Sequence, residues 1–184
     1  MSAQPLSPLA PEHYLEIDRK ADYKSEYYRG VMYAMAGGTY NHGLIILNTG
    51  AEIRQALGDR PCSVTSVDVR LRVAETGLFT YPDLMVVCGD PAFADNRKDT
   101  ILNPIVIAEV LSPSTEAHDR GFKFAHYRRI AALQEYLLVS QSEPNVERYV
   151  RQPDGQWMFS ETRGYDGILP LESLGCAIPL SGIY

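Results

Sequence analysis

The sequence of 184 residues has only three cysteines, Cys62, Cys88 and Cys176, and none of them forms a CxxC pair. An odd number of widely separated cysteines argues against a zinc cage or a disulfide framework. We therefore interpret all three as buried free thiols. A chain of this length buries roughly 70% of the surface that its unfolded form exposes, so its core needs neither disulfides nor a structural metal.

An excess of positive charge is also lacking. The 17 lysines and arginines stand against 23 aspartates and glutamates, which gives a net charge of −6 with histidine neutral. Domains that coat nucleic acid through bulk charge usually have a pI above about 9, so this chain has to engage any nucleic acid locally. No hydrophobic run is long enough to span a membrane, and residues 1–10 lack the basic and apolar regions of a secretory signal. We expect a cytoplasmic protein without a membrane partner.

The residue patterns predict a single α+β domain over residues 1–184 with a mixed sheet, residues 1–10 being a flexible N-terminus. Nearly continuous apolar runs at 78–88 and 104–111 are typical of strands that are covered on both faces. The other predicted elements are a short helix at 11–20, a hairpin around Arg29–Gly30, a long helix at 41–57, two short strands within 62–73, an exposed connection at 89–103, a helix at 119–132, and a terminal antiparallel meander of strands at 135–139, 146–150 and 157–161.

Two carboxylates interrupt the apolar runs. Asp83 follows Pro82, and Glu109 stands within the run 105–111. An unpaired ionised carboxylate in a protein interior is very unfavourable, so each has to be protonated, paired with a cation or bound to a metal. If the two runs form an antiparallel pair with Cys88 opposite Pro104, Asp83 lies directly opposite Glu109, with Cβ atoms about 5 Å apart.

Carboxylates at that distance repel each other, and a hard divalent cation relieves the repulsion. Mg²⁺ takes oxygen ligands, keeps several waters and leaves coordination positions for phosphate oxygens. The alternative is that one or both carboxylates simply pair with Arg70, Arg72 or Lys123.

A third component follows Glu109. The helix predicted at 119–132 aligns Asp119 with Lys123 at i, i+4, and it can turn back over the sheet end that carries Glu109. A lysine held there can donate to a water nucleophile or to the charge that develops on a phosphate. The alternative is a solvent-exposed ion pair worth a few tenths of a kcal/mol. Residues 119–129 carry four basic side chains against one acidic side chain, which predicts a local charge of +3 beside the site.

These features together resemble the Uma-two family of restriction endonucleases, a bacterial branch of the PD-(D/E)XK nuclease superfamily. The resemblance runs from about Pro11 to the C-terminus. The residues that carry it are Glu26 with Gly30, His42, Tyr81-Pro82-Asp83, the string from Glu109 to Thr115 (EVLSPST), Asp119, Lys123, Tyr127 and Glu135-Tyr136.

The resemblance implies a restriction-endonuclease-like core, a mixed sheet flanked by helices, with an N-terminal hairpin and C-terminal antiparallel strands. It also implies a Mg²⁺ or Mn²⁺ cofactor and hydrolysis of phosphodiester bonds. Asp83 and Glu109 would be the metal-binding carboxylates, with the carbonyl of Val110 as a further ligand. Glu26 would be an additional acidic ligand or a base.

The chain departs from the superfamily pattern at one position. The third signature residue of the superfamily is a lysine two positions after the second carboxylate, where this chain has Leu111. The resemblance therefore nominates Lys123, with Asp119, on the following helix. His42 is a further candidate because the family places a histidine there, although a histidine near a helix N-terminus is more often a capping or core residue. No role is assigned to His13, His118 or His126.

We expect from these residues a metal-dependent endonuclease with DNA as its substrate. A homodimer is compatible with this function because double-strand cleavage needs two active sites. Two alternatives stay open. The chain could retain the nuclease scaffold as a non-catalytic binding or assembly module, since fold does not determine function, or it could be a metal-dependent phosphodiesterase that acts on small nucleotides.

Overall fold

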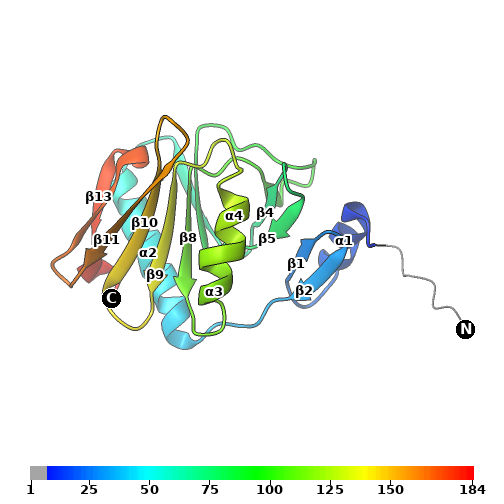
Figure 1. Ribbon diagram of the computed structural model, residues 1–184, viewed down its shortest axis with the longest axis horizontal. Coiled ribbons are helices and arrows are strands. Elements are labelled where there is room, and N and C mark those ends of the chain that lie inside the picture. Colours follow the sequence, from blue (N-terminus) through cyan, green and yellow to red (C-terminus); the bar gives the residue numbers. More distant parts are fainter. Residues whose placement is uncertain (1–7) are drawn as a thin grey trace, which may run out of the picture.

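The computed structural model describes residues 8–184, and in this part of the chain the strands form two mixed sheets and a separate hairpin (Figure 1). The six-stranded sheet has the order β11 (Trp157–Arg163), β10 (Asn145–Arg151), β9 (Glu135–Ser140), β8 (Val106–Leu111), β6 (Leu84–Cys88), β3 (Cys62–Ser66). The five-stranded sheet has the order β2 (Val31–Ala34), β1 (Ser25–Tyr28), β5 (Leu78–Thr80), β4 (Arg70–Val73), β7 (Thr100–Ile101). The hairpin pairs β12 (Ile168–Leu171) with β13 (Cys176–Pro179). The predicted α+β class with a mixed sheet is confirmed, because β8–β9 and β4–β7 are parallel and the other pairs are antiparallel.

Strands β6 and β8 of the six-stranded sheet are buried on both faces, as the apolar runs predicted. Alternate residues of each strand point to opposite faces. On one face Val86 and Ala108 pack against the long helix α2 (Tyr40–Leu57) and the β12–β13 hairpin. On the other face Met85 and Ile107 pack with the five-stranded sheet and with the helical segment that follows β8. Glu109 lies two residues after Ile107 in β8, so its side chain points to the same face of the sheet.

The first three predicted elements are confirmed. Helix α1 (Pro11–Asp18) begins with a proline, which suits a first helical turn. The β1–β2 hairpin turns at Arg29 and Gly30, whose φ angles of 49° and 84° match the tight hairpin turn that the sequence predicted. Helix α2 is capped by Thr39, whose side chain accepts a hydrogen bond from the backbone N–H of His42. The cap places His42 in the first turn of the helix.

The run 78–88 is two strands rather than one. Strand β5 belongs to the five-stranded sheet and β6 to the six-stranded sheet, and the chain passes between them at Tyr81-Pro82-Asp83. Proline has no N–H to donate to a strand ladder, so the run cannot continue as one paired strand through this point. Asp83 consequently stands at the junction of the two sheets.

The helix predicted at 119–132 begins earlier and ends earlier. The segment consists of α3 (Glu116–His118), a π-helical turn (Asp119–Lys123) and α4 (Phe124–Tyr127). It lies across the face of the sheet next to β8 (Figure 1). A widened π turn inside a helix often marks a functional site, and here it contains both Asp119 and Lys123.

Two further expectations about the elements were wrong. The connection 89–103 is not wholly exposed, because it contains β7, whose Thr100 and Ile101 are buried. The meander of β9, β10 and β11 forms as predicted but is not terminal, since the β12–β13 hairpin follows it. Strands of two to four residues are too short to show a clear hydrophobic period.

The interpretation of the cysteines was also wrong in part. Cys62 and Cys88 form a disulfide, and Cys176 is a half-buried free thiol. Antiparallel pairing of β3 with β6 places Cys62 directly opposite Cys88, a partnership that their spacing of 26 residues does not reveal.

Of the N-terminal segment that we expected to be flexible, residues 1–7 lie outside the described residues. Beyond them, the backbone N–H of Leu9 donates to the carbonyl of Gly30, and the Tyr27 hydroxyl donates to the carbonyl of Leu9. None of the described helices combines the length and apolar character needed to cross a membrane.

Candidate active site

Asp83 and Glu109 face each other across β6 and β8 in the predicted register. Leu84 lies opposite Ala108 and Val86 opposite Val106. The same register, extended by one residue, places Asp83 opposite Glu109. The backbone N–H of Asp83 donates to Glu109 Oε2 at 3.2 Å, and the N–H of Val110 donates to Asp83 Oδ2 at 2.8 Å. The two carboxylates are thus held by the backbone of each other's strand.

Glu109 is almost completely buried and still has ionic and polar partners. Its side chain is 2% exposed. Lys123 Nζ lies 3.1 Å from Glu109 Oε1, and the hydroxyl of Tyr127 donates to the same oxygen at 2.7 Å. The alternative of a simple ion pair is therefore realised in part, with Lys123 rather than with Arg70 or Arg72.

Lys123 also contacts two further carboxylates. Its Nζ lies 2.9 Å from Asp119 Oδ1 and 3.8 Å from Glu26 Oε1. The lysine side chain is only 8% exposed, so the alternative of a solvent-exposed Asp119–Lys123 pair is wrong. Three carboxylates, those of Glu26, Glu109 and Asp119, thus surround this lysine, and Asp83 lies beside Glu109.

Glu26 reaches the cluster from the N-terminal hairpin. In the antiparallel pairing of β1 with β5, Tyr27 lies opposite Phe79, so Glu26 adjoins Thr80. The Thr80 hydroxyl donates to Glu26 Oε1 at 2.5 Å, and His118 Nε2 lies 3.0 Å from Glu26 Oε2. Both oxygens of Glu26 are therefore engaged by other side chains.

His118 is the site residue that the sequence reasoning missed. It received no role, yet it lies one residue before Asp119 and contacts Glu26. The available indication was its place inside the segment that carries the family resemblance. Its position directly before Asp119 was the other indication in the sequence.

His42 lies in the first turn of α2 and lines the smaller of two cavities at the site together with Lys123. Its Nε2 is 3.0 Å from the carbonyl oxygen of Val110 and 3.4 Å from Asp83 Oδ2. The histidine therefore contacts two of the predicted metal-binding groups. The Asp83 carboxylate, together with the Val110 carbonyl and against the effect of partial burial, raises the pKa of His42.

Burial and carboxylate crowding control the protonation of the site. Burial raises the pKa of Glu109 to about 8; Lys123 opposes this shift, while Asp83 and Asp119 add to it. Burial alone would lower the pKa of Lys123, but the charges of Glu109, Asp119 and Glu26 outweigh it and raise that pKa. The cluster is short of positive charge and favours uptake of a proton or a cation.

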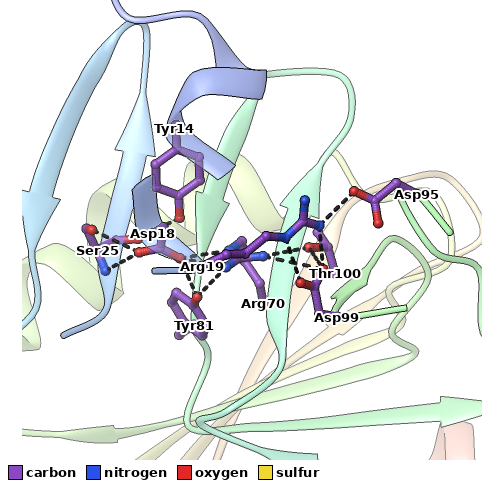
Figure 2. A network of polar contacts seen from close by, with 9 residues as sticks. All are labelled: Tyr14, Asp18, Arg19, Ser25, Arg70, Tyr81, Asp95, Asp99 and Thr100. Carbon is purple, nitrogen blue, oxygen red and sulfur yellow. Dashed lines mark hydrogen bonds and ion pairs between the residues drawn. The ribbon is translucent and has the colours of Figure 1, made fainter. Parts of the chain in front are cut away.

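A buried polar network anchors the strand junction that carries Asp83 (Figure 2). Tyr81 donates from its hydroxyl to Asp18 Oδ2 at 2.5 Å and accepts from Arg70 at 2.7 Å. Arg70 also donates to Asp18 Oδ2 at 2.6 Å, and Ser25 donates to Asp18 Oδ1 through both its N–H and its hydroxyl. The network ties α1, β1 and β4 to Tyr81, two residues before Asp83.

The donor set fits a hard divalent cation. Asp83, Glu109 and the Val110 carbonyl offer oxygen atoms on neighbouring strands, and Mg²⁺ is commonly held by one or two carboxylates with water completing its shell. Within residues 8–184, no group of three or more His, Cys, Asp or Glu side chains is arranged to hold a metal alone. A cation at this site would therefore depend on the two carboxylates, the carbonyl and oxygen atoms from water or substrate.

Two adjoining cavities open on this cluster. The smaller, of about 470 Å³, is lined by Glu26, Asp83, Glu109 and Lys123 among others. The larger, of about 760 Å³, lies over the network of Asp18, Arg70 and Tyr81. They share residues 35–39, His42, Tyr81 and Asp83. The candidate site is thus open to a ligand along two connected hollows.

The predicted local charge of +3 is largely compensated. Arg120 pairs with Glu116 at 2.8 Å and also with Glu147, and Arg129 lies 3.6 Å from Glu75. With Lys123 committed to the buried cluster, the exposed Arg128 is the one basic side chain of this segment that has no ion pair among the described residues.

Comparisons with known proteins identify the family. Residues 11–181 match the Uma2 family, described as "Putative restriction endonuclease". The uncharacterized protein slr1290 of Synechocystis sp. is 37% identical over 182 residues, covering 98% of this chain and 93% of the relative. The uncharacterized protein sll1609 of the same organism is 38% identical over 156 residues, which cover 85% of this chain and 88% of the relative.

One solved structure has the same fold. The crystal structure of "a putative nuclease belonging to DUF820" from Anabaena variabilis matches with a TM-score of 0.76 at 16% identity. The match covers 96% of this chain and 97% of that one. At this identity the likeness extends to the fold alone.

Proposed function

The chain belongs to the Uma2 family, and from this premise we propose that it is a divalent-metal-dependent endonuclease that hydrolyses phosphodiester bonds of DNA. The observation that carries the proposal is the pair of carboxylates, Asp83 and Glu109, which face each other from adjacent strands beside a buried lysine. A nuclease-like fold with hard oxygen donors next to a cationic donor suits hydrolysis of a phosphate ester.

Asp83, Glu109 and the carbonyl of Val110 would hold the cation, which we take to be Mg²⁺ or Mn²⁺. When bound, the cation supplies Lewis-acid stabilisation of the negative charge that develops on the phosphate. Glu109 is oriented for this task by Tyr127 and Lys123, and Asp83 by the backbone of Val110. The ligands are therefore preorganised on rigid strands.

Lys123 would donate to the attacking water or to a non-bridging phosphate oxygen. Its ammonium lines the smaller cavity and stays charged because three carboxylates surround it. Asp119 positions the lysine from one helical turn away, and Glu26 with His118 closes the other side of the cluster. A donor fixed in place before the reaction stabilises developing charge without reorganisation.

His42 would act as a positioning residue. It contacts both the Val110 carbonyl and Asp83, so it orients two of the predicted ligands. Gly38 packs against its ring, and a Cβ added there would lie 2.7 Å from His42 Nδ1, whereas a Cβ at Gly37 meets nothing within 4 Å. Gly38→Ala should therefore weaken Mn²⁺ binding in calorimetry, and Gly37→Ala should leave it unchanged.

The central experiment is a titration of Mg²⁺ and Mn²⁺ with supercoiled plasmid and with single-stranded DNA as substrates. We expect cleavage that requires the metal and that falls by about 100-fold or more in Asp83→Asn and in Glu109→Gln, since both keep the shape of the carboxylate and remove its charge. Asp90→Asn, at an exposed carboxylate outside both cavities, serves as the matched control.

Cleavage by Glu109→Gln at the rate of the parent would overturn the proposal. Metal binding without cleavage of any DNA would favour the non-catalytic module. Hydrolysis of small phosphodiesters with no DNA cleavage would favour the small-nucleotide phosphodiesterase.

A further inference from the structure

Two exposed tyrosines line the two cavities, and a third follows a lining residue in the sequence. Tyr23, 58% exposed, lines the larger cavity, and Tyr33, 53% exposed, lines the smaller. Tyr33 lies directly opposite Glu26 in the β1–β2 pair, and residues paired in this way project to the same side. Tyr40, 84% exposed, follows Thr39, which lines both cavities. Exposed aromatic rings are thus spread along the route that leads to Asp83.

The charges along this route do not favour a phosphate backbone. Of the described residues, five carboxylates and three Lys or Arg side chains line the larger cavity, and four carboxylates and one lysine line the smaller. Each of these four cations is already paired. Arg19 pairs with Asp95 and Asp99, Lys24 with Asp68, Arg70 with Asp18 and Lys123 with Glu109.

The carboxylate excess disfavours a duplex, because a duplex presents its phosphates outward and stacks its bases inside. An unpaired strand also exposes the faces of its bases, and their stacking on aromatic side chains adds affinity that does not come from positive charge. Resting on the proposed function, we infer that the two cavities bind a single-stranded DNA segment whose bases stack on Tyr23 and Tyr33 and whose scissile phosphate reaches Asp83 and Glu109. Stacking, rather than neutralisation of phosphates, would then provide most of the affinity.

The experiment measures binding by fluorescence anisotropy, with a labelled oligothymidylate of about ten nucleotides. A strand of the same length that carries abasic sites is compared, because it has the same phosphates and no bases. Ca²⁺, which also takes carboxylate ligands, replaces Mg²⁺, and a gel checks that the strand stays intact. The matched control for Tyr23→Ala and Tyr33→Ala is Tyr165→Ala, since Tyr165 is 62% exposed and lines neither cavity.

We expect each of Tyr23→Ala and Tyr33→Ala to weaken binding about five- to hundredfold, and Tyr165→Ala to leave it unchanged. The parent should prefer the strand with bases to the abasic strand and to a duplex, with little loss of affinity between about 50 and 200 mM salt. Equal binding of the abasic strand, a preference for duplex, unaffected tyrosine variants, or absence of binding would each overturn the inference.

Binding and cleavage are read separately, so the two proposals fail in different ways. Metal-dependent plasmid cleavage with unaffected tyrosine variants would overturn the stacking inference and leave the proposed function intact. Tyrosine-dependent strand binding without any cleavage would do the reverse. Tyr23, Tyr33 and Tyr165 are all exposed, so the melting temperatures of the three alanine variants should match that of the parent. Equal melting temperatures exclude misfolding as the cause of weaker binding.

Discussion

Lys123 is the residue on which the electrostatics of the site depend. Removing one partner of a buried ion pair leaves an uncompensated charge, which typically costs about 3–5 kcal/mol. Here the lysine faces Glu109, Asp119 and Glu26 at once. A divalent cation at Asp83 and Glu109 would supply the same kind of compensation from the other side of Glu109.

Replacement of Lys123 by methionine separates these two sources of positive charge. We expect Lys123→Met to lower the free energy of unfolding by about 3–5 kcal/mol without metal, to bind Mn²⁺ at least as tightly as the parent, and to lose DNA cleavage. Urea unfolding and calorimetry measure the first two effects. Lys20→Met is the control, because Lys20 is exposed. Unchanged cleavage by Lys123→Met would assign the lysine a structural role only.

At the scale of elements, what could be predicted were the features that repeat along a strand or helix. Continuous apolar runs indicated the buried strands, and counting from Cys88 and Pro104 gave the register that places Asp83 opposite Glu109, which the structure has. The helical spacing of Asp119 and Lys123 likewise indicated their contact. The second relation follows from local periodicity alone, whereas the first also depended on the assumption that the two runs pair with Cys88 opposite Pro104.

The features that could not be predicted depend on contacts between distant segments. The pairing of β3 with β6 brings Cys62 to Cys88, and the packing of β1 on β5 brings Glu26 to His118. Neither partnership has a period or a fixed spacing in the chain. The break at Pro82 was visible as a residue, but which sheet each half joins is decided by tertiary packing.

The disulfide between β3 and β6 should contribute measurably to stability. In the chain-entropy view, a cross-link over 26 residues stabilises a fold by about 3 kcal/mol. We expect the double variant Cys62→Ala, Cys88→Ala to unfold at correspondingly lower urea, and Cys176→Ala to match the parent. Thiol titration of the denatured, unreduced protein should find one free cysteine; three would show that the bridge does not form.

The junction of the two sheets should be sensitive to the loss of one hydroxyl. In Tyr81→Phe, Asp18 and Arg70 each lose a buried partner, which costs about 1–3 kcal/mol. Because Tyr81 precedes Asp83 by two residues, we also expect weaker Mn²⁺ binding in calorimetry. Tyr165→Phe, at an exposed tyrosine, is the control. Lower stability with unchanged metal affinity would limit the network to a structural role.

At the scale of the whole molecule, the net charge of −6 and the acidic cavities have one consequence in common. Among residues 8–184, every Lys and Arg that lines the two cavities is paired, so long-range attraction of nucleic acid to the cleft is weak. On the proposed function, local features, which here are the carboxylate pair and the exposed tyrosines, would have to provide binding. The stability of the fold then becomes linked to whatever cation the carboxylates take up.

That linkage predicts how stability depends on pH and on Mg²⁺. The pKa of Glu109 is raised to about 8 in the folded protein, so its protonation stabilises the metal-free fold fully below about pH 4.5, and this contribution is lost as pH rises through about 8. His42, whose pKa is also raised, acts in the same direction. The metal-free melting temperature should therefore fall over this range.

Mg²⁺ should restore that stability, and more so at high pH, because it competes with the proton for Glu109. A ligand at a concentration 100 times its dissociation constant adds about 2.7 kcal/mol to the free energy of unfolding. This gain raises the melting temperature of a chain of this size by roughly 5–11 °C. We expect this increase at about pH 9, a smaller one at about pH 6, and none in Asp83→Asn. An equal increase in the parent and in Asp83→Asn would mean that Mg²⁺ binds elsewhere.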